Sequence, residues 1–329
     1  MSENQQVNNP VLEVSNLSID FATDYGTFNV IDDISYAVNS GEILGIVGES
    51  GCGKTVSSLA VMGLLAKNAR VRTGTISFGG KNLLAVRESE LRQMRGAEFS
   101  MIFQDPMKSL DPVCTVGSQI TEALTEHRSA TKEEARQAAV AMLKNVDIPS
   151  PERIFKSYPH ELSGGMKQRI MIAMALICSP KLIIADEPTT ALDVTIQAQI
   201  LDLLAGINRE MGTAIVMITH DLGVISDMCD RVLVMYAGHI VESAEKRAIF
   251  EKPRHPYTRG LLDSIPKLDE TREELAYIPG VVPSPQNFPQ GCRFSTRCGR
   301  ALPKCATEVP PPFAVGDSLV KCWLYEEGK

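Results

Sequence analysis

The stretch at residues 48–55 reads GESGCGKT and directly follows the apolar run ILGIV. It fits the pattern G-x-x-x-x-G-K-[ST], in which small residues let successive backbone N–H groups turn toward a phosphate. A helix after such a loop adds the positive end of its dipole. Lys54 can then reach the β and γ oxygens of a nucleotide, and the hydroxyl of Thr55 can ligate Mg2+. We therefore predict a nucleotide phosphate site formed by Gly48, Ser50, Gly51, Cys52, Gly53, Lys54, Thr55 and Val56.

A pair of acids follows the apolar run KLIIA, in the segment KLIIADEP. An acid at the C-terminal end of a strand lies on the side where α/β sheets bind ligands. We predict that Asp186 holds Mg2+ through its water shell and that Glu187 orients and polarises the attacking water. A solvated turn is the alternative interpretation of this pair, and the phosphate loop makes it less favoured.

The segment LSGGMKQR at residues 162–169 precedes a long apolar stretch that is typical of a buried helix. Ser163, Gly164 and Gly165 would form an anion site at the N-terminus of that helix, and Ser163 would also be its N-cap. Two phosphate-binding helix ends are redundant for one nucleotide in one subunit. They are explained if two subunits face each other and each completes the other's site.

The order of apolar runs predicts the elements that position these residues. Runs and turn residues alternate over residues 11–47, which indicates short strands, and TVSSLAVMGLLA after the loop has helical periodicity. TISF, FSMIF, KLIIA, TAIVMIT and RVLVMY are expected to be further strands. This alternation predicts an α/β fold with a largely parallel core sheet and helices on both faces. The early strands are expected to form a smaller antiparallel part.

Two regions depart from that alternation. The pattern is helical over residues 116–146, which predicts an inserted helical subdomain at about 105–178. Past Ser264 prolines become frequent and helical periodicity fades. We therefore expect a nucleotide-binding domain at residues 1–264 and a proline-rich C-terminal extension at 265–329.

Composition narrows the possible partners. The net charge of −7 argues against broad binding to nucleic acid, which favours a basic surface. The start MSENQQVNNP is polar and is not expected to be a signal peptide, and no apolar stretch approaches the roughly 18 residues of a membrane span. A cytosolic protein is expected, so another subunit would supply any membrane spans.

The segment LSGGMKQ resembles the signature motif of the ATP-binding cassette (ABC) ATPases, and the order of motifs is similar to that family across residues 11 to about 260. The resemblance implies an ABC-type P-loop NTPase with a mixed core sheet, an antiparallel β part and an inserted helical subdomain. It also implies roles for further residues. Gln104 in FQDP would link the metal and the attacking water to the transmembrane partner, so the Mg2+ ligands would be Thr55, Gln104 and Asp186.

Three more positions carry roles that the resemblance implies. Asp193, at the end of TALD, would lie at the dimer interface, and His220 in ITHD would contact the γ-phosphate. Tyr25 would stack on adenine, with Phe28 as a nearby competitor and simple packing as the alternative. Met166 replaces the glutamine of the commonest LSGGQ motif, but the serine and glycines that face phosphate are intact.

The segments EKPRHPYTRGLLDSIP, MIFQDPMKSLDP and ADEPTTALDVTIQAQI resemble the ATPases of dipeptide and oligopeptide importers. This resemblance implies an ATP-hydrolysing subunit on the cytoplasmic side of the membrane. It would be peripheral and would act with a second, related ABC ATPase, two transmembrane permease subunits and, indirectly, an extracytoplasmic peptide-binding protein. A nickel or other small-solute importer is the closest alternative. A soluble cassette protein that acts on nucleic acid or ribosomes and a non-catalytic ATP-binding subunit are more remote.

Four of the eight cysteines, Cys292, Cys298, Cys305 and Cys322, lie in the extension with the spacing C-x5-C-x6-C-x16-C. In a cytosolic chain such a group favours a metal over disulfides. Four thiolates on loops predict an iron–sulfur cluster, here 4Fe-4S. Zn2+ is the alternative, although the short C-x2–4-C pairs of structural zinc sites are missing from the sequence. Similar cysteine-bearing tails occur in the importers that the chain resembles, and unligated thiols or disulfides are the remaining possibilities.

Overall fold

The structure is a computed structural model, and it describes residues 10–190, 192–265 and 277–326. The polar start MSENQQVNNP, which is not expected to be a signal peptide, lies outside the described residues except for Pro10. The chain divides into two compact units. The first comprises Met1–Leu12, Val38–Glu42 and Phe78–Met217, and the second comprises Glu13–Ala37, Ile43–Ser77 and Ile218–Lys329.

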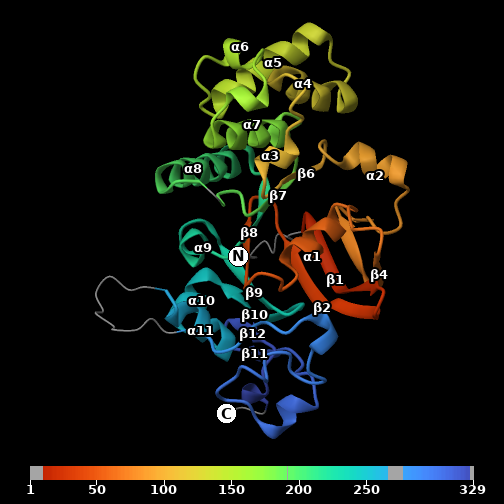
Figure 1. Cartoon of the computed structure of the whole chain (residues 1–329), viewed down its shortest axis with the longest axis vertical. Coiled ribbons are helices and arrows are strands. Elements are labelled where there is room, and N and C mark those ends of the chain that lie inside the picture. The colour runs from red at the N-terminus through yellow and green to blue at the C-terminus, as the bar shows by residue number, and fades with distance from the viewer. Residues whose placement is uncertain (1–9, 191, 266–276, 327–329) are drawn as a thin grey trace, which may run out of the picture. The chain divides into compact units, whose positions relative to one another are not determined.

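The first unit is mainly helical (Figure 1). Its strands are β5 (Lys81–Asn82), β6 (Phe99–Ile102), β7 (Leu182–Asp186) and most of β8 (Ala214–Thr219). Its helices are α2 (Glu88–Met94), α3 (Pro106–Ser109), α4 (Val116–His127), α5 (Lys132–Asn145), α6 (Pro151–Ile154), η1 (Pro159–Glu161), α7 (Gly164–Leu176) and α8 (Val194–Met211). β6 pairs in parallel with β7, where Met101 lies opposite Ile184, and every residue of both strands is buried.

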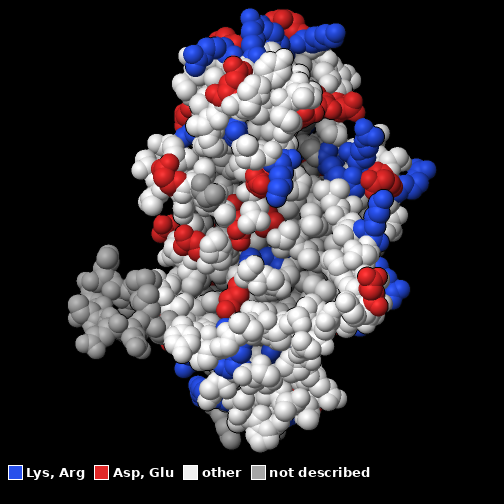
Figure 2. Space-filling view, in the orientation of Figure 1, with Lys and Arg blue, Asp and Glu red and all other residues white. Residues whose placement is uncertain are grey.

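Helix α7 packs against α4 and α5 in the first unit. Nine of its residues are buried, and from Ile170 onward the buried residues are all apolar, as the run IMIAMALIC predicts for a buried helix. Helix α5 begins with a capping box in which Thr131 and Glu134 satisfy each other's backbone N–H groups. Over α4–α6 the visible surface mixes charges of both signs (Figure 2). Within α5, Arg136 forms an ion pair with Glu133.

The second unit holds the remaining elements. Its strands are β1 (Leu12–Thr23), β2 (Gly26–Val38), β3 (Ile43–Val47), β4 (Ala69–Phe78), β9 (Arg231–Tyr236), β10 (His239–Glu245), β11 (Phe313–Val315) and β12 (Ser318–Val320). Its helices are α1 (Lys54–Val61), α9 (Leu222–Met228), α10 (Lys246–Glu251), α11 (Pro256–Asp263), η2 (Pro285–Asn287), η3 (Pro303–Ala306) and η4 (Trp323–Tyr325).

Two sheets contribute to the second unit. β1, β2 and β4 belong to the smaller sheet, which contains early strands as predicted. The early run ILGIV is different: as β3 it lies in the larger sheet, parallel to β9, with Ile46 opposite Leu233. All five residues of β3 are buried, which explains why it is apolar throughout instead of alternating.

Antiparallel strands extend the larger sheet, which is therefore mixed. β9 pairs antiparallel with β10, and β10 pairs with β12 from the proline-rich extension, with Glu242 opposite Val320. β11 pairs antiparallel with β12. The extension thus adds strands to a sheet of the cassette, and the domain boundary near residue 265 stays a prediction. Within the described residues, none of the helices is both long and apolar enough to cross a membrane.

Candidate functional site

The phosphate loop of the second unit connects β3 to α1 (Figure 1). The side chain of Lys54 is buried, and its Nζ donates to the carbonyl of Gly48 at 2.7 Å and to that of Glu49 at 3.2 Å. The loop carbonyls therefore hold the ammonium group at the start of the helix. Burial raises the pKa of the Cys52 thiol, so this residue of the loop is an uncharged packing group.

The conformation of the loop depends on Gly53. Its φ of +105° is in the region that L side chains rarely adopt, and a Cβ there would lie 2.4 Å from Cδ1 of Ile31. Gly53 is also the N-cap of α1. Glycine at this position therefore lets the chain turn into the helix, where the backbone N–H groups can face an anion.

The predicted acids lie at the end of β7 in the first unit, and Gln104 lies beside them. Asp186 is the last residue of the strand and is buried. Nε2 of Gln104 donates to Oε2 of Glu187 at 2.7 Å, and the Thr190 hydroxyl donates to the same oxygen at 2.9 Å. Glu187 has a φ of +47°, a conformation that costs of order 1 kcal/mol in a non-glycine residue. The fold therefore holds this carboxylate in a strained, doubly hydrogen-bonded position.

The serine–glycine turn of the first unit is the start of α7. Ser163 is the N-cap, with its side chain accepting from the backbone N–H of Met166, and Gly164 is the first helical residue. Ser163 and Gly164 are exposed. Asp193 caps α8 in the same way, accepting from the N–H of Ile196 at 2.9 Å. Both predicted interface positions are thus helix N-caps whose side chains are solvent-accessible.

The other predicted residues lie in the second unit. His220 is exposed and follows β8 directly. Tyr25 lies in the turn between β1 and β2, and 84% of its surface is exposed, as an aromatic that meets a ligand requires. Thr55 is exposed at the start of α1. The roles of these residues toward ATP stay predictions.

The four cysteines of the extension are free thiols. Among the described residues no set of three or more His, Cys, Asp and Glu side chains is arranged to hold a metal ion, so the structure does not support the predicted iron–sulfur cluster or its zinc alternative. Burial raises the pKa of Cys292 to about 12 and that of Cys322 to about 11.

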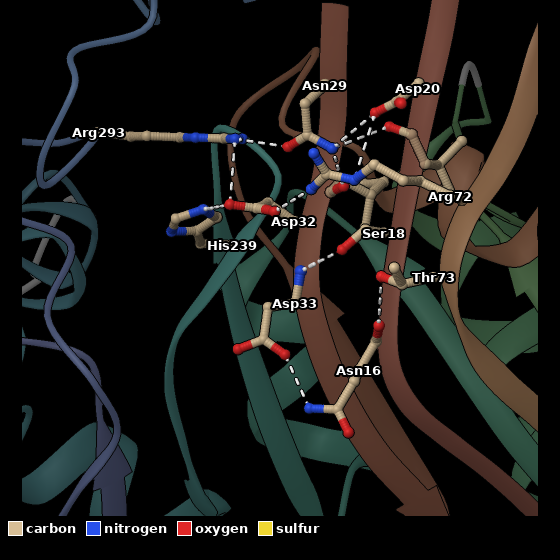
Figure 3. A network of polar contacts seen from close by, with 12 residues as sticks. Asn16, Ser18, Asp20, Asn29, Asp32, Asp33, Arg72, Thr73, His239 and Arg293 are labelled. Carbon is tan, nitrogen blue, oxygen red and sulfur yellow. Dashed lines mark hydrogen bonds and ion pairs between the residues drawn. The ribbon is translucent and has the colours of Figure 1, made fainter.

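Sequence analysis missed a group that contacts the phosphate loop. Arg297, in the segment CRFSTRC of the extension, forms a two-point ion pair with Glu49 of the loop. Arg293 of the same segment joins a polar network with Asp32 and His239 (Figure 3). The signal in the sequence is the pair of arginines between Cys292 and Cys298.

Comparison with known proteins gives matches along most of the chain. A family model described as "ABC transporter" matches residues 31–190, and one described as "Oligopeptide/dipeptide transporter, C-terminal region" matches residues 241–305. The chain is 49% identical over 319 residues to the oligopeptide transport ATP-binding protein AppD of Bacillus subtilis, which covers 96% of this chain and 97% of the relative. It is 50% identical over 300 residues to the dipeptide transport ATP-binding protein DppD of Escherichia coli, with 91% and 92% covered.

Solved structures give the same result for the fold. A dimeric post-hydrolysis state of an ATP-binding cassette bound to ADP and Pi has a TM-score of 0.65 and 26% identity, covering 72% of this chain and 99% of that one. The cbiO1 protein from Clostridium perfringens, part of an ABC transporter complex, has a TM-score of 0.63 and 28% identity, covering 74% and 92%. The chain therefore belongs to the ABC transporter ATP-binding proteins, in the group that includes the oligopeptide and dipeptide transport ATP-binding proteins.

Proposed function

We propose that the chain is the ATP-hydrolysing subunit that powers import of dipeptides or oligopeptides through a separate membrane permease. The observation that carries this proposal is the hydrogen bond between Gln104 and Glu187 in a chain about half identical to peptide transport ATP-binding proteins over nearly its full length. The bond joins the residue expected to communicate with the permease to the residue expected to activate water. ATP hydrolysis and transport would be coupled through that contact.

The chemistry of hydrolysis follows from the side chains present. Water attacks the γ-phosphorus, Glu187 accepts the proton of that water, and ADP leaves with its β-oxygen taking the bonding electrons. The carboxylate suits this role because the Gln104 and Thr190 donors fix its orientation. Lys54 and His220 would contact the β- and γ-phosphates and stabilise the charge that develops there.

Mg2+ is implied by the same chemistry. Its expected ligands, Thr55, Gln104 and Asp186, offer hydroxyl, amide and carboxylate oxygens, which are the hard donors that Mg2+ prefers. Because Nε2 of Gln104 donates to Glu187, the amide oxygen is the atom suited to ligation. When bound, the ion would neutralise charge on the phosphates.

The active assembly is proposed to contain two ATPases, this chain and a partner that is related to it but distinct. The exposed turn at Ser163 and Gly164 would complete the partner's ATP site, and Asp193 would lie at the interface. A related cassette at 26% identity forms a dimer, which supports this arrangement. Two permease subunits and an extracytoplasmic peptide-binding protein complete the importer, so the chain would be peripheral on the cytoplasmic face of the membrane.

Replacing Glu187 with Gln tests the assignment. The variant keeps the shape of the side chain and loses the base, so ATP hydrolysis by the complex should fall at least about a hundredfold while ATP binding persists. An ATP-bound closed dimer should accumulate. Hydrolysis at the normal rate would refute the role of Glu187.

Uptake measurements test the substrate class. Cells that lack this subunit should fail to accumulate labelled dipeptides or oligopeptides, and the wild-type chain should restore uptake whereas Glu187→Gln should not. Loss of nickel uptake with normal peptide uptake would instead support the alternative importer.

The four cysteines are also proposed as the ligands of a 4Fe-4S cluster, with Zn2+ as the alternative. The spacing of the four cysteines supports this proposal, and the backbone N–H of Cys292 donates to the carbonyl of Cys305 at 2.8 Å, which brings two of them together. The thiols would have to reorient to bind, because they are not in a ligating arrangement. Analysis of anaerobically purified protein for iron and acid-labile sulfide tests this. One equivalent of zinc alone would favour the alternative, and no metal would reject both.

A further inference from the structure

The extension contacts the phosphate loop through one arginine. Nη1 of Arg297 donates to Oε2 of Glu49 at 2.7 Å, and Nη2 donates to Oε1 at 3.0 Å. Glu49 is the second residue of the loop GESGCGKT. Only 4% of the Arg297 side chain is exposed, against 32% for Glu49. A two-point pair of this kind fixes the orientation of the two side chains as well as neutralising their charges, and the interaction is stronger because the guanidinium is shielded from water.

The guanidinium of Arg297 is itself fixed in place. Its Nε donates to the carbonyl of Pro279 at 2.9 Å, and its Nη2 also donates to the carbonyl of Ile278 at 3.3 Å. The guanidinium carbon lies 5.7 Å from the centroid of the buried Tyr236 ring. The planar group thus makes five hydrogen bonds, to two carbonyls, the Glu49 carboxylate and, at 3.4 Å, the Tyr236 hydroxyl, which lysine could not reproduce.

The backbone of Glu49 is also held by a residue that lies much later in the sequence. Its N–H donates to the hydroxyl of Tyr257 at 2.9 Å, and the Tyr257 ring packs edge-on against Tyr236 at 4.7 Å. The carboxylate and the amide of Glu49 are thus both tied to residues far later in the sequence. The conformation of the loop at Glu49 is therefore stabilised by contacts from outside the loop.

The position of Glu49 affects Lys54 directly. Nζ of Lys54 donates to the Glu49 carbonyl, so displacement of Glu49 would displace the ammonium that is expected to meet the phosphates. Charge matters as well, because a carboxylate without a partner in this loop would repel the phosphates of ATP. Arg297 neutralises that carboxylate.

We propose that Arg297 is a positioning residue for ATP binding: it orients the phosphate loop through Glu49 and cancels the negative charge of that residue. The proposal rests on the proposed function, because it assumes that this loop binds ATP. It gives the C-terminal extension a part in nucleotide affinity.

The principal test is the pair of variants Arg297→Met and Arg297→Met with Glu49→Gln. ATP binding to the purified full-length chain is measured by calorimetry, and steady-state hydrolysis is measured in the assembled complex. Arg297→Met should weaken ATP binding about tenfold and raise KM similarly, with little change in kcat, since the effect is on binding. Adding Glu49→Gln removes the unpaired carboxylate and should restore affinity to within about threefold of wild type.

The double variant separates charge cancellation from simple packing. If Arg297 only fills space, Arg297→Met will leave ATP affinity unchanged, or the loss will persist after Glu49→Gln, and either result overturns the proposal. Should Arg297→Met not fold, Arg297→Lys gives the second measurement. It keeps the charge but loses the two-point geometry, so binding should weaken about threefold, and unchanged affinity would overturn the proposal.

Arg293→Met is the matched control. Arg293 is in the same segment, but its Nη2 donates to Asn29 at 2.8 Å and lies 3.7 Å from Oδ2 of Asp32 (Figure 3). Its guanidinium also stacks over the Phe288 ring. This variant should lower thermal stability without changing KM for ATP. Lys54→Ala distinguishes failure of the proposed ATP site from failure of the role given to Arg297. If Lys54→Ala still binds ATP normally, the loop is not the ATP site. If Lys54→Ala loses ATP binding but Arg297→Met does not, only the role of Arg297 is rejected.

Discussion

Gln104 holds Glu187 by a hydrogen bond of 2.7 Å, although the two residues are 83 positions apart in the sequence. Gln104 follows β6 and Glu187 follows β7, which are neighbouring parallel strands. Because the carboxyl ends of parallel strands meet at the same edge of a sheet, the two side chains meet there. A displacement of Gln104 by a partner protein would therefore change the orientation of the expected base.

Replacing Gln104 with Glu should make ATP hydrolysis strongly pH-dependent. Two carboxylates at hydrogen-bond distance share a proton, which raises the pKa of the pair. The base is then protonated at neutral pH, so kcat should fall about tenfold at pH 7 and recover as the pH rises and the proton leaves. The measurement is a kcat profile between pH 6 and 9 for the assembled complex.

Gln104→Met serves as the control because it removes the hydrogen bond without adding a charge. Its rate should be lower than that of wild type, but its pH profile should have the wild-type form. A native pH profile for Gln104→Glu would show that the two side chains do not interact during the reaction.

Replacing Gly53 with Ala should destabilise the chain more than replacing Gly51 with Ala. Both glycines have positive φ, +105° and +78°, so each alanine carries a strain of about 1–2 kcal/mol. Only Gly53 adds a steric overlap, with Cδ1 of the fully buried Ile31, while a Cβ at Gly51 meets nothing within 4 Å. Overpacking of this kind costs about 1–3 kcal/mol more.

Thermal unfolding without nucleotide measures this difference, since no phosphate is then present to contact either alanine. Adding Ile31→Val to Gly53→Ala removes Cδ1 and should recover part of the loss. Equal midpoints for the two alanine variants would contradict the role given to Ile31.

Local patterns predicted the elements that carry the expected chemistry. The apolar runs ILGIV and LIIA lie in the buried strands β3 and β7; the loop follows β3, Asp186 ends β7 and Glu187 follows it. The apolar run after LSGGMKQR is α7, with Ser163 as its N-cap. These features depend on short-range periodicity and capping, which the sequence contains explicitly.

Long-range pairings could not be predicted in the same way. Nothing local places ILGIV beside β9 instead of in the smaller sheet, because a fully apolar strand does not specify its neighbour. The pairing of β10 with β12 and the ion pair of Glu49 with Arg297 join positions more than 70 residues apart. The cysteine spacing suggested a metal, but spacing does not determine how thiols point, and the described side chains are not arranged to hold one.

Acid should destabilise the chain through His255. Burial lowers the pKa of this side chain to about 3, whereas it is 6.5 in its ordinary state. Below pH 6.5 His255 therefore binds a proton in the unfolded chain but not in the folded chain. The free energy of unfolding consequently decreases as the pH falls from 6.5 toward 3. Between pH 7 and pH 5 the loss should be about 2 kcal/mol.

The measurement is urea unfolding at pH 7 and pH 5 of wild type and His255→Asn. Nδ1 of His255 accepts from the N–H of Tyr257 at the start of α11, and asparagine can keep that cap without titrating. The variant should therefore lose less stability than wild type between the two pH values. Equal losses would assign the acid sensitivity to other groups.

Replacing Ser163 with Asp should abolish ATP hydrolysis while leaving the chain folded. Ser163 caps α7 by accepting from Met166, and aspartate is as good an N-cap as serine, so the free energy of unfolding should change by no more than about 0.5 kcal/mol. In the proposed assembly this turn faces the phosphates held by the partner subunit. A carboxylate there would repel them, and hydrolysis should fall at least about a hundredfold.

Two further variants isolate the cause of that loss. Ser163→Asn keeps the cap without charge and should retain far more activity than Ser163→Asp, because only repulsion is removed. Thr131→Asp makes the same kind of change at the exposed N-cap of α5 and should leave hydrolysis unchanged. ATPase assays on the assembled complex give the rates, and circular dichroism gives the stabilities. If Ser163→Asp hydrolyses ATP at the wild-type rate, the turn does not contact phosphate and the shared site is disproved. Because aspartate keeps the N-cap of α7, the rate of this variant reports on charge and not on folding.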